Sequence, residues 1–200
     1  MRFKKIVFSI SFFIFWGCHF DSGKSELCFI GDSITHQWDT ESFFSGYATK
    51  KYAVSGAKLR DVDEWETKDC ADQTIVFLIG TNDIGFLSPD KKNIQDSLLN
   101  FAHTYAQKAR SFFANPLLVI SILPRNYQNY DQIASNKMIQ MQNLLIKQQL
   151  DSLKVDYKFI DVFKYFLNKD YMINEDLFRD GLHPNPEGYE LLSNIVKDYL

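Results

Sequence analysis

A serine near the start of the chain stands where a nucleophile would be useful. The stretch Phe-Ile-Gly-Asp-Ser at 29–33 leads from an apolar run, typical of a buried strand, into the expected start of a helix. A serine at such a turn lies beside backbone N–H groups that can hold an anion. Ser33 is therefore a candidate nucleophile. The simpler alternative is a helix cap, because serine is among the preferred N-cap residues.

A candidate base and its partner lie near the other end of the chain, in the run Asp-Gly-Leu-His-Pro at 180–184. His183 could take the serine proton as a general base. Asp180 is close enough in sequence to hold the imidazole in the tautomer that this task needs. A turn-forming aspartate and a loop histidine beside a helix cap are the simpler alternatives.

Two further positions could stabilise the negative oxygen that forms during acyl transfer. Gly56 follows a short expected strand, and Asn82 follows a long apolar one. A backbone N–H and a side-chain amide at these places could donate hydrogen bonds to an oxyanion. Either residue could also serve only its own turn, because glycine tolerates positive φ and asparagine is a common turn former.

Alternating strands and helices must position these residues. The apolar runs predict strands at 27–30, 52–54, 74–79, 117–122 and 157–160. The helical spacing predicts helices at 33–45 (short and irregular), 90–114, 132–153, and after Asn185, which can cap a helix with Pro186 at its first position. This alternation predicts a parallel sheet between two helix layers, with the ligand beyond the carboxyl ends of the strands.

For the helix at 132–153 the spacing predicts a single apolar side. That side would carry Ile133, Met138, Met141, Leu144, Leu145 and Leu150.

Taken together and in order, four segments resemble the four blocks of the SGNH (GDSL-type) hydrolases: 31–33, Gly56, 80–83 and 180–184. The resemblance extends over 27–200. The Leu-Pro-Arg run at 123–125 and the residues at 185–189 resemble the branch of the family that is similar to platelet-activating-factor acetylhydrolases. Many bacterial carbohydrate esterases share this sequence pattern. The resemblance to SGNH hydrolases implies a flavodoxin-like, three-layer α/β/α sandwich with a five-stranded parallel sheet.

The resemblance also implies roles for particular residues. Ser33 would be the nucleophile, His183 the base and Asp180 its orienter. The oxyanion hole would consist of the N–H of Ser33, the N–H of Gly56 and the side-chain amide of Asn82. This chemistry needs no cofactor and no metal ion.

The favoured hypothesis is a serine esterase that removes small acyl groups, most simply acetyl, from carbohydrate. A lysophospholipase or thioesterase is the first alternative, and a non-catalytic surface protein that binds glycans is the second. His36, Tyr127 and Tyr130 are candidate substrate contacts, and His36 is also a rival base. Arg125 could bind an acidic group or pair with a carboxylate.

The N-terminal residues resemble an export signal rather than part of the domain. A basic start and an apolar run predict a signal peptide at 1–17, which ends before Cys18 as in a bacterial lipobox. Residues 18–25 would be a tether, and 26–200 the hydrolase domain. Lipid-modified Cys18 would hold a cell-envelope lipoprotein on the periplasmic or surface side, with no other membrane contact. An ordinary secretory signal or an uncleaved anchor remains open.

Charge disfavours one class of partner, and the cysteine content raises the question of a disulfide. The chain has 22 basic and 25 acidic residues, and no basic stripe follows the signal, which disfavours nucleic acid as a partner. Cys28 and Cys70 could pair in an exported protein. The expectation is nevertheless two separate buried thiols, because Cys28 falls within a predicted strand. The sequence does not indicate an oligomeric state.

Overall fold

A five-stranded, wholly parallel sheet forms the centre of the computed structural model, which describes residues 25–200 except 86, 113, 127–130 and 155. The strands are β1 (Glu26–Gly31), β2 (Ala48–Ala53), β3 (Thr74–Leu78), β4 (Leu117–Ile120) and β5 (Lys158–Ile160). Their order, β2-β1-β3-β4-β5, is that of the flavodoxin-like fold, as expected. The predicted signal peptide, Cys18, Tyr127 and Tyr130 lie outside the described residues.

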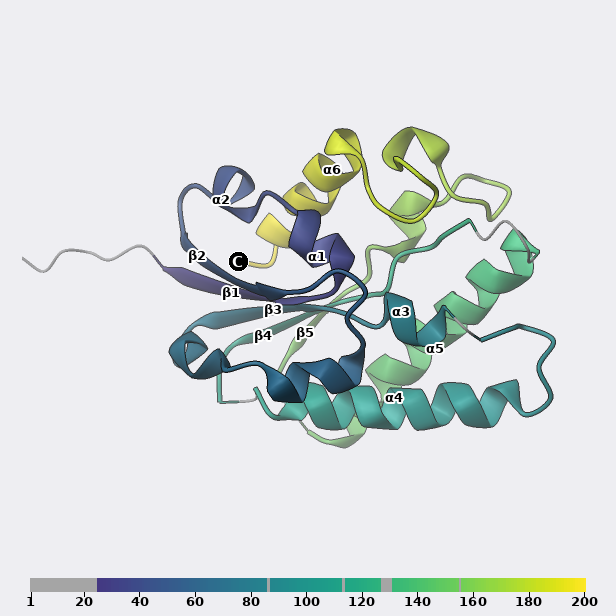
Figure 1. The fold of residues 1–200 in the computed structure, drawn as a ribbon, viewed down its shortest axis with the longest axis horizontal. Helices are drawn as coiled ribbons and strands as arrows, with labels where there is room; N and C mark the ends of the chain where they lie inside the picture. The colour runs from purple at the N-terminus through teal and green to yellow at the C-terminus, as the bar shows by residue number, and fades with distance from the viewer. Residues whose placement is uncertain (1–24, 86, 113, 127–130, 155) are drawn as a thin grey trace, which may run out of the picture.

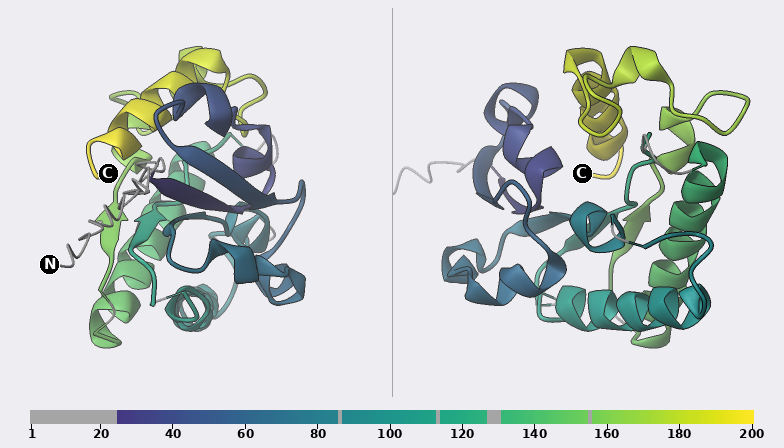
Figure 2. Two further views of the ribbon diagram at one scale, coloured as in Figure 1. Left: turned by 90° about the vertical axis from the view of Figure 1, so that its left-hand side faces the viewer. Right: turned by 45° about the vertical axis from the view of Figure 1, so that its right-hand side comes forward.

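Helices cover both faces of this sheet (Figures 1 and 2). One face carries α1 (Ser33–Gln37), α2 (Thr40–Phe43) and α6 (Pro186–Lys197), and the other carries η1 (Leu59–Glu64), η2 (Thr67–Cys70), α4 (Ile94–Arg110) and α5 (Gln132–Ser152). Three short helices lie in the connections. Helix α3 (Thr81–Ile84) follows β3, η3 (Phe163–Phe166) follows β5, and η4 (Glu175–Leu177) precedes α6. No helix among the described residues is long and apolar enough to cross a membrane.

Two apolar cores lie on the two faces of the sheet. Alternate side chains of β1 enter different cores, with Cys28 and Ile30 on the α4–α5 side and Leu27 and Phe29 on the α6 side. Both faces are therefore buried, which explains why the central strands are continuous apolar runs.

Strand β2 begins earlier than its predicted range of 52–54. It spans Ala48–Ala53, and none of its six residues is buried. Val54, expected inside the strand, lies beyond it and is 52% exposed. The strand lies at the edge of the sheet, where polar residues such as Lys50 and Lys51 are common and the apolar signal is weak.

Helix α5 buries only part of the apolar side that its spacing predicts: Met138 and Leu150 are buried, but Ile133 is exposed. Met141 and Leu144 are about half exposed, whereas Asn136, Gln142 and Asn143 are buried. The side chain of Asn143 accepts from the N–H of Ile122 and donates to its carbonyl, both at 2.9 Å. Ile122 lies beyond the end of β4, where the sheet no longer supplies hydrogen-bond partners. Its buried backbone groups therefore need partners from side chains.

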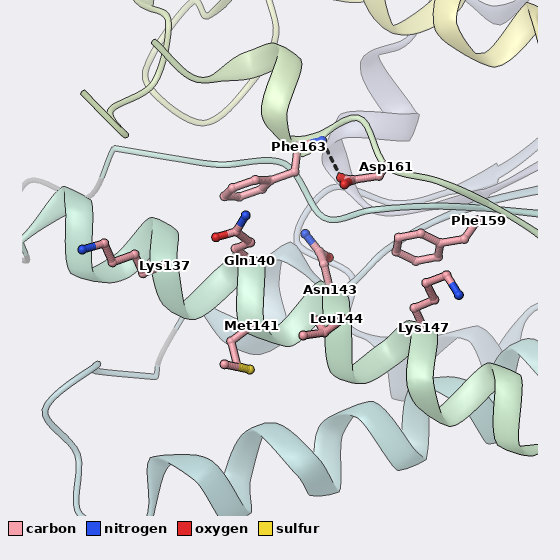
Figure 3. A pocket seen from close by; sticks show the side chains of 9 residues that line it. All are labelled: Lys137, Gln140, Met141, Asn143, Leu144, Lys147, Phe159, Asp161 and Phe163. Carbon is pink, nitrogen blue, oxygen red and sulfur yellow. Dashed lines mark hydrogen bonds between the residues drawn. The ribbon is translucent and has the colours of Figure 1, made fainter. Parts of the chain in front are cut away.

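A groove of about 580 Å³ runs along α5, between this helix and the chain from β5 to η3 (Figure 3). Phe159 and Phe163 face it from the strand side, and Lys137 and Lys147 flank it on the helix. It contains none of the predicted site residues.

The expectation of two separate thiols is wrong. Cys28 and Cys70 form a disulfide that joins β1 to the end of η2, with Cα atoms 5.8 Å apart. Cys28 leaves β1 on the face that η2 covers, so two buried cysteines meet in the core. The bridge closes a loop of 42 residues that contains Ser33 and Gly56.

Replacing both cysteines with alanine should lower the free energy of unfolding by about 2–4 kcal/mol, because the open chain regains loop entropy when it unfolds. Urea unfolding monitored by circular dichroism measures this change. The wild-type protein in reductant should show the same loss. Equal midpoints for the oxidised, reduced and double-variant proteins would contradict the prediction.

Candidate active site

Ser33 begins α1 at the carboxyl end of β1. Asp32 caps the helix, and its Oδ1 accepts the N–H of Ile34 at 3.0 Å. A side chain at Gly31 would collide with the carbonyl of Leu78 and with Thr35, so glycine is required there for the close approach of β1 to β3. The N–H of Ser33 lies in the first turn, where backbone donors have no partner within the helix.

His183 lies against this serine although 150 residues separate them. Its Nε2 is 3.0 Å from Ser33 Oγ, and its Nδ1 is 2.7 Å from Asp180 Oδ2. Asp180 Oδ1 accepts the N–H groups of Leu182 at 3.0 Å and His183 at 2.8 Å. With Nδ1–H donating to the carboxylate, Nε2 is the free acceptor for the serine hydroxyl.

The carboxyl group of Asp180 is held ionised by its neighbours. Partial burial raises its pKa. Hydrogen bonds from the backbone and imidazole of His183 and from the N–H of Leu182 outweigh this effect and lower the pKa to about 2. Asp180 is therefore a carboxylate at neutral pH, and it can stabilise an imidazolium at His183.

Asn82, a candidate oxyanion donor, is tied to the turn that contains Gly56, another candidate donor. Gly56 has φ +81° in the turn that the N–H of Ala57 closes on the carbonyl of Val54, at 3.1 Å. The Nδ2 of Asn82 donates to the carbonyl of Ala57 at 2.9 Å. Because an amide group carries two N–H bonds, one can hold this turn while the other remains for an oxyanion.

Helix α3, which carries Asn82, is held at both ends by buried charges. Asp32 Oδ2 accepts the N–H of Thr81 at 3.3 Å; burial raises the pKa of Asp32 to about 6, against the hydrogen bonds that lower it. Arg125, only 1% exposed, donates from Nη1 and Nη2 to the carbonyls of Thr81 and Ile84, both at 2.8 Å. Both of these contacts of Arg125 are with backbone carbonyls.

A comparison with protein-family models identifies the family of this chain. The model of the GDSL-like Lipase/Acylhydrolase family matches residues 29–191, which includes all the predicted catalytic, oxyanion-hole and substrate-contact residues but not Cys18. The chain belongs to this family. As a member it is a serine ester hydrolase, and the resemblance to SGNH hydrolases is confirmed.

Solved structures share this fold, and those less than 25% identical to this chain show the fold alone. A Streptococcus pneumonia protein provisionally assigned as a platelet activating factor is 28% identical, with a TM-score of 0.67 over 90% of this chain and 86% of that one. A GDSL-like lipase from Bacteroides thetaiotaomicron is 22% identical, with a TM-score of 0.67 over 88% and 87%. The acetylxylan esterase Axe2 from Geobacillus stearothermophilus is 16% identical, with a TM-score of 0.63 over 88% and 94%, and shows the fold alone. No curated protein matched this chain.

In this GDSL-family enzyme, His36, the predicted substrate contact and rival base, contacts the edge strand. His36 is exposed, and its Nδ1 lies 3.0 Å from the carbonyl of Ala53, at the end of β2. This contact ties His36 to the edge strand rather than to Ser33. Within the described part of the chain, no three histidine, cysteine, aspartate or glutamate side chains gather as a metal site would require.

Several residues around the site have no clear signal in the sequence. Arg179 Nη2 donates to Gln37 Oε1 at 2.7 Å and lies 3.6 Å from Asp180 Oδ2, which links the histidine loop to α1. Asn136 Oδ1 accepts the N–H of Arg125 at 3.0 Å. The polar residues inside the apolar pattern of α5 are the one sequence feature that could have indicated this support.

Replacing Arg125 with methionine should lower the free energy of unfolding by about 2–4 kcal/mol, because the buried carbonyls of Thr81 and Ile84 lose their donors. Urea unfolding provides the measurement. Arg110→Met, at an exposed position on α4, is the matched control and should change stability by less than about 0.5 kcal/mol. Equal effects of the two substitutions would refute the bracing role of Arg125.

Proposed function

We propose that this enzyme removes small acyl groups, most simply acetyl, from esterified carbohydrate. In this proposal Ser33 is the nucleophile, His183 the general base and Asp180 its orienter. The observation that carries it is the chain of contacts from Ser33 Oγ to His183 Nε2 at 3.0 Å and from His183 Nδ1 to Asp180 Oδ2 at 2.7 Å.

The reaction would proceed through an acyl-enzyme. His183 takes the proton of Ser33 while Oγ attacks the ester carbonyl, and the N–H groups of Ser33 and Gly56 and the amide of Asn82 bind the oxyanion. When the tetrahedral intermediate collapses, the protonated His183 gives its proton to the leaving alcohol. Water then attacks the acyl-enzyme with His183 again as the base, which releases the acid and restores Ser33.

Three arguments favour a short acyl group on a sugar. Acetylxylan esterases are among the proteins of similar fold, although their identity to this chain is only 16–18%. The predicted signal peptide and Cys18 would make the protein a cell-envelope lipoprotein outside the cytoplasm. Glycans are available as substrates in that compartment. The small domain also leaves little room for a lid over a long acyl chain.

Ser33→Ala should lower the rate of 4-nitrophenyl acetate hydrolysis by at least about 10³-fold, because covalent catalysis is lost while the binding site remains. Circular dichroism verifies the fold of the variant. Ser152→Ala, at the exposed end of α5, is the matched control and should keep wild-type activity. A folded Ser33→Ala enzyme with full activity would end the proposal.

Among 4-nitrophenyl esters from acetyl to palmitoyl, kcat/KM should be highest for the shortest acyl groups and fall as the chain lengthens. The physical reason is that a site for a small acyl group excludes additional methylene groups. Initial rates in detergent-free buffer, below the solubility limit of each ester, give the series. Activity that rises with chain length would instead favour the lysophospholipase or thioesterase hypothesis.

A further inference from the structure

A hollow of about 650 Å³ lies between α1, α2 and the start of α6, and its lining includes Arg179, the chain neighbour of Asp180. Gln37 borders it one helical turn after Ser33, and Pro184 borders it next to His183. The other lining residues are Asp39, Phe43, Arg179, Asn185, Pro186 and Tyr189. Its volume is within the usual range for sites that bind small molecules.

The mechanism fixes which part of the substrate lies on this side. His183 must protonate the leaving alcohol, so the alcohol oxygen has to come within hydrogen-bond reach of Nε2. The oxyanion lies toward Gly56 and Asn82. The remainder of the alcohol therefore extends along the loop that carries His183, where the hollow is found.

A second and smaller hollow, of about 360 Å³, borders the same loop, and its lining includes Asp180 of the proposed triad. Its lining includes Asn126, Glu175 and Phe178, and it shares only Arg179 with the larger one. An alcohol that occupied either hollow would therefore lie near Arg179.

The floor of the larger hollow is apolar and fixed. Tyr189 donates from its hydroxyl to the carbonyl of Ile34 at 2.8 Å, and its ring stacks on Trp38 with centroids 6.3 Å apart. Phe43 and Pro186 add further apolar surface to the lining. A pyranose ring presents apolar C–H groups on its faces, which such a surface can cover.

The rim of this hollow is polar and carries both signs of charge. The side chain of Arg179 is 58% exposed, and the carboxylate of Asp39 is exposed as well. Arg179 uses one N–H on Gln37, so further guanidinium donors remain for a ligand. The Asn185 side chain is already engaged, since it accepts from Gly188 and donates to Asp176.

On the basis of the proposed esterase function, we propose that this hollow binds the sugar that carries the ester, and that Arg179 sets the preference for that alcohol. A donor on one part of the rim and an acceptor on another match the hydroxyl groups of a neutral pyranose. A sugar with its own carboxylate would meet Asp39 as well as Arg179, so a neutral ring is the better fit.

Substrates with the same acyl group and different alcohols test this assignment. We would measure kcat and KM for 4-nitrophenyl acetate and for the tri-O-acetylated methyl pyranosides of xylose and glucuronic acid. In Arg179→Gln and Phe43→Leu, kcat/KM for the xyloside relative to that for 4-nitrophenyl acetate should fall about tenfold, mainly through KM. Glu175→Gln, which changes only the smaller hollow, should keep the wild-type ratio. The wild-type enzyme should prefer the xyloside to the glucuronide.

The outcomes separate this inference from the proposed function. Unchanged ratios in Arg179→Gln and Phe43→Leu, a fall confined to Glu175→Gln, or a wild-type preference for the glucuronide would overturn the sugar site. In each of these cases Ser33-dependent hydrolysis of 4-nitrophenyl acetate would leave the esterase proposal standing. A wild-type enzyme that hydrolyses none of the three esters would overturn both.

Discussion

The contact between Ser33 Oγ and His183 Nε2 depends on the common direction of the strands. In a parallel sheet all carboxyl ends meet at one edge, so residues 150 positions apart can come within 3.0 Å. The histidine loop is fixed there by an antiparallel bridge between Phe178 and Pro184 and by the N–H of Arg179, which donates to the carbonyl of His183 at 2.9 Å. The base is therefore set in place by backbone hydrogen bonds as well as by Asp180.

The opposite side of the site relies on charges buried in the core. Helix α3 has four residues, too few to be stable by itself. The carboxylate of Asp32 meets the N–H of Thr81, and the guanidinium of Arg125 meets the carbonyls of Thr81 and Ile84. Burying these groups is costly unless every polar contact is made, and the same contacts fix the position of Asn82.

Sequence reasoning predicted the parts of the fold that have strong local signals. The apolar runs of β1, β3 and β4 and the Asn185-Pro186 start of α6 gave those elements, and the order of the four motif blocks gave the fold class. Edge strand β2 was placed too late because its exposed residues show no apolar run. The polar side of α5 was missed because its partners are backbone groups of a distant segment.

Contacts across the fold were the hardest to predict from the residues. The Cys28–Cys70 pairing depends on how η2 packs against β1, which residue spacing does not encode. For Arg125 the sequence suggested contacts with acidic groups, and no sequence pattern shows that a guanidinium will also bind helix carbonyls. The link from Arg179 to Gln37 joins residues at nearly opposite ends of the domain.

The most direct test of the central claim is the rate at which an alkyl fluorophosphonate labels the enzyme, with the adduct located by peptide mass spectrometry. If His183 activates Ser33, the wild-type enzyme should carry one adduct, on Ser33, and labelling of a folded His183→Ala variant should be slower by at least about 10³-fold. An adduct on another residue, or equal labelling rates in the two proteins, would contradict the account.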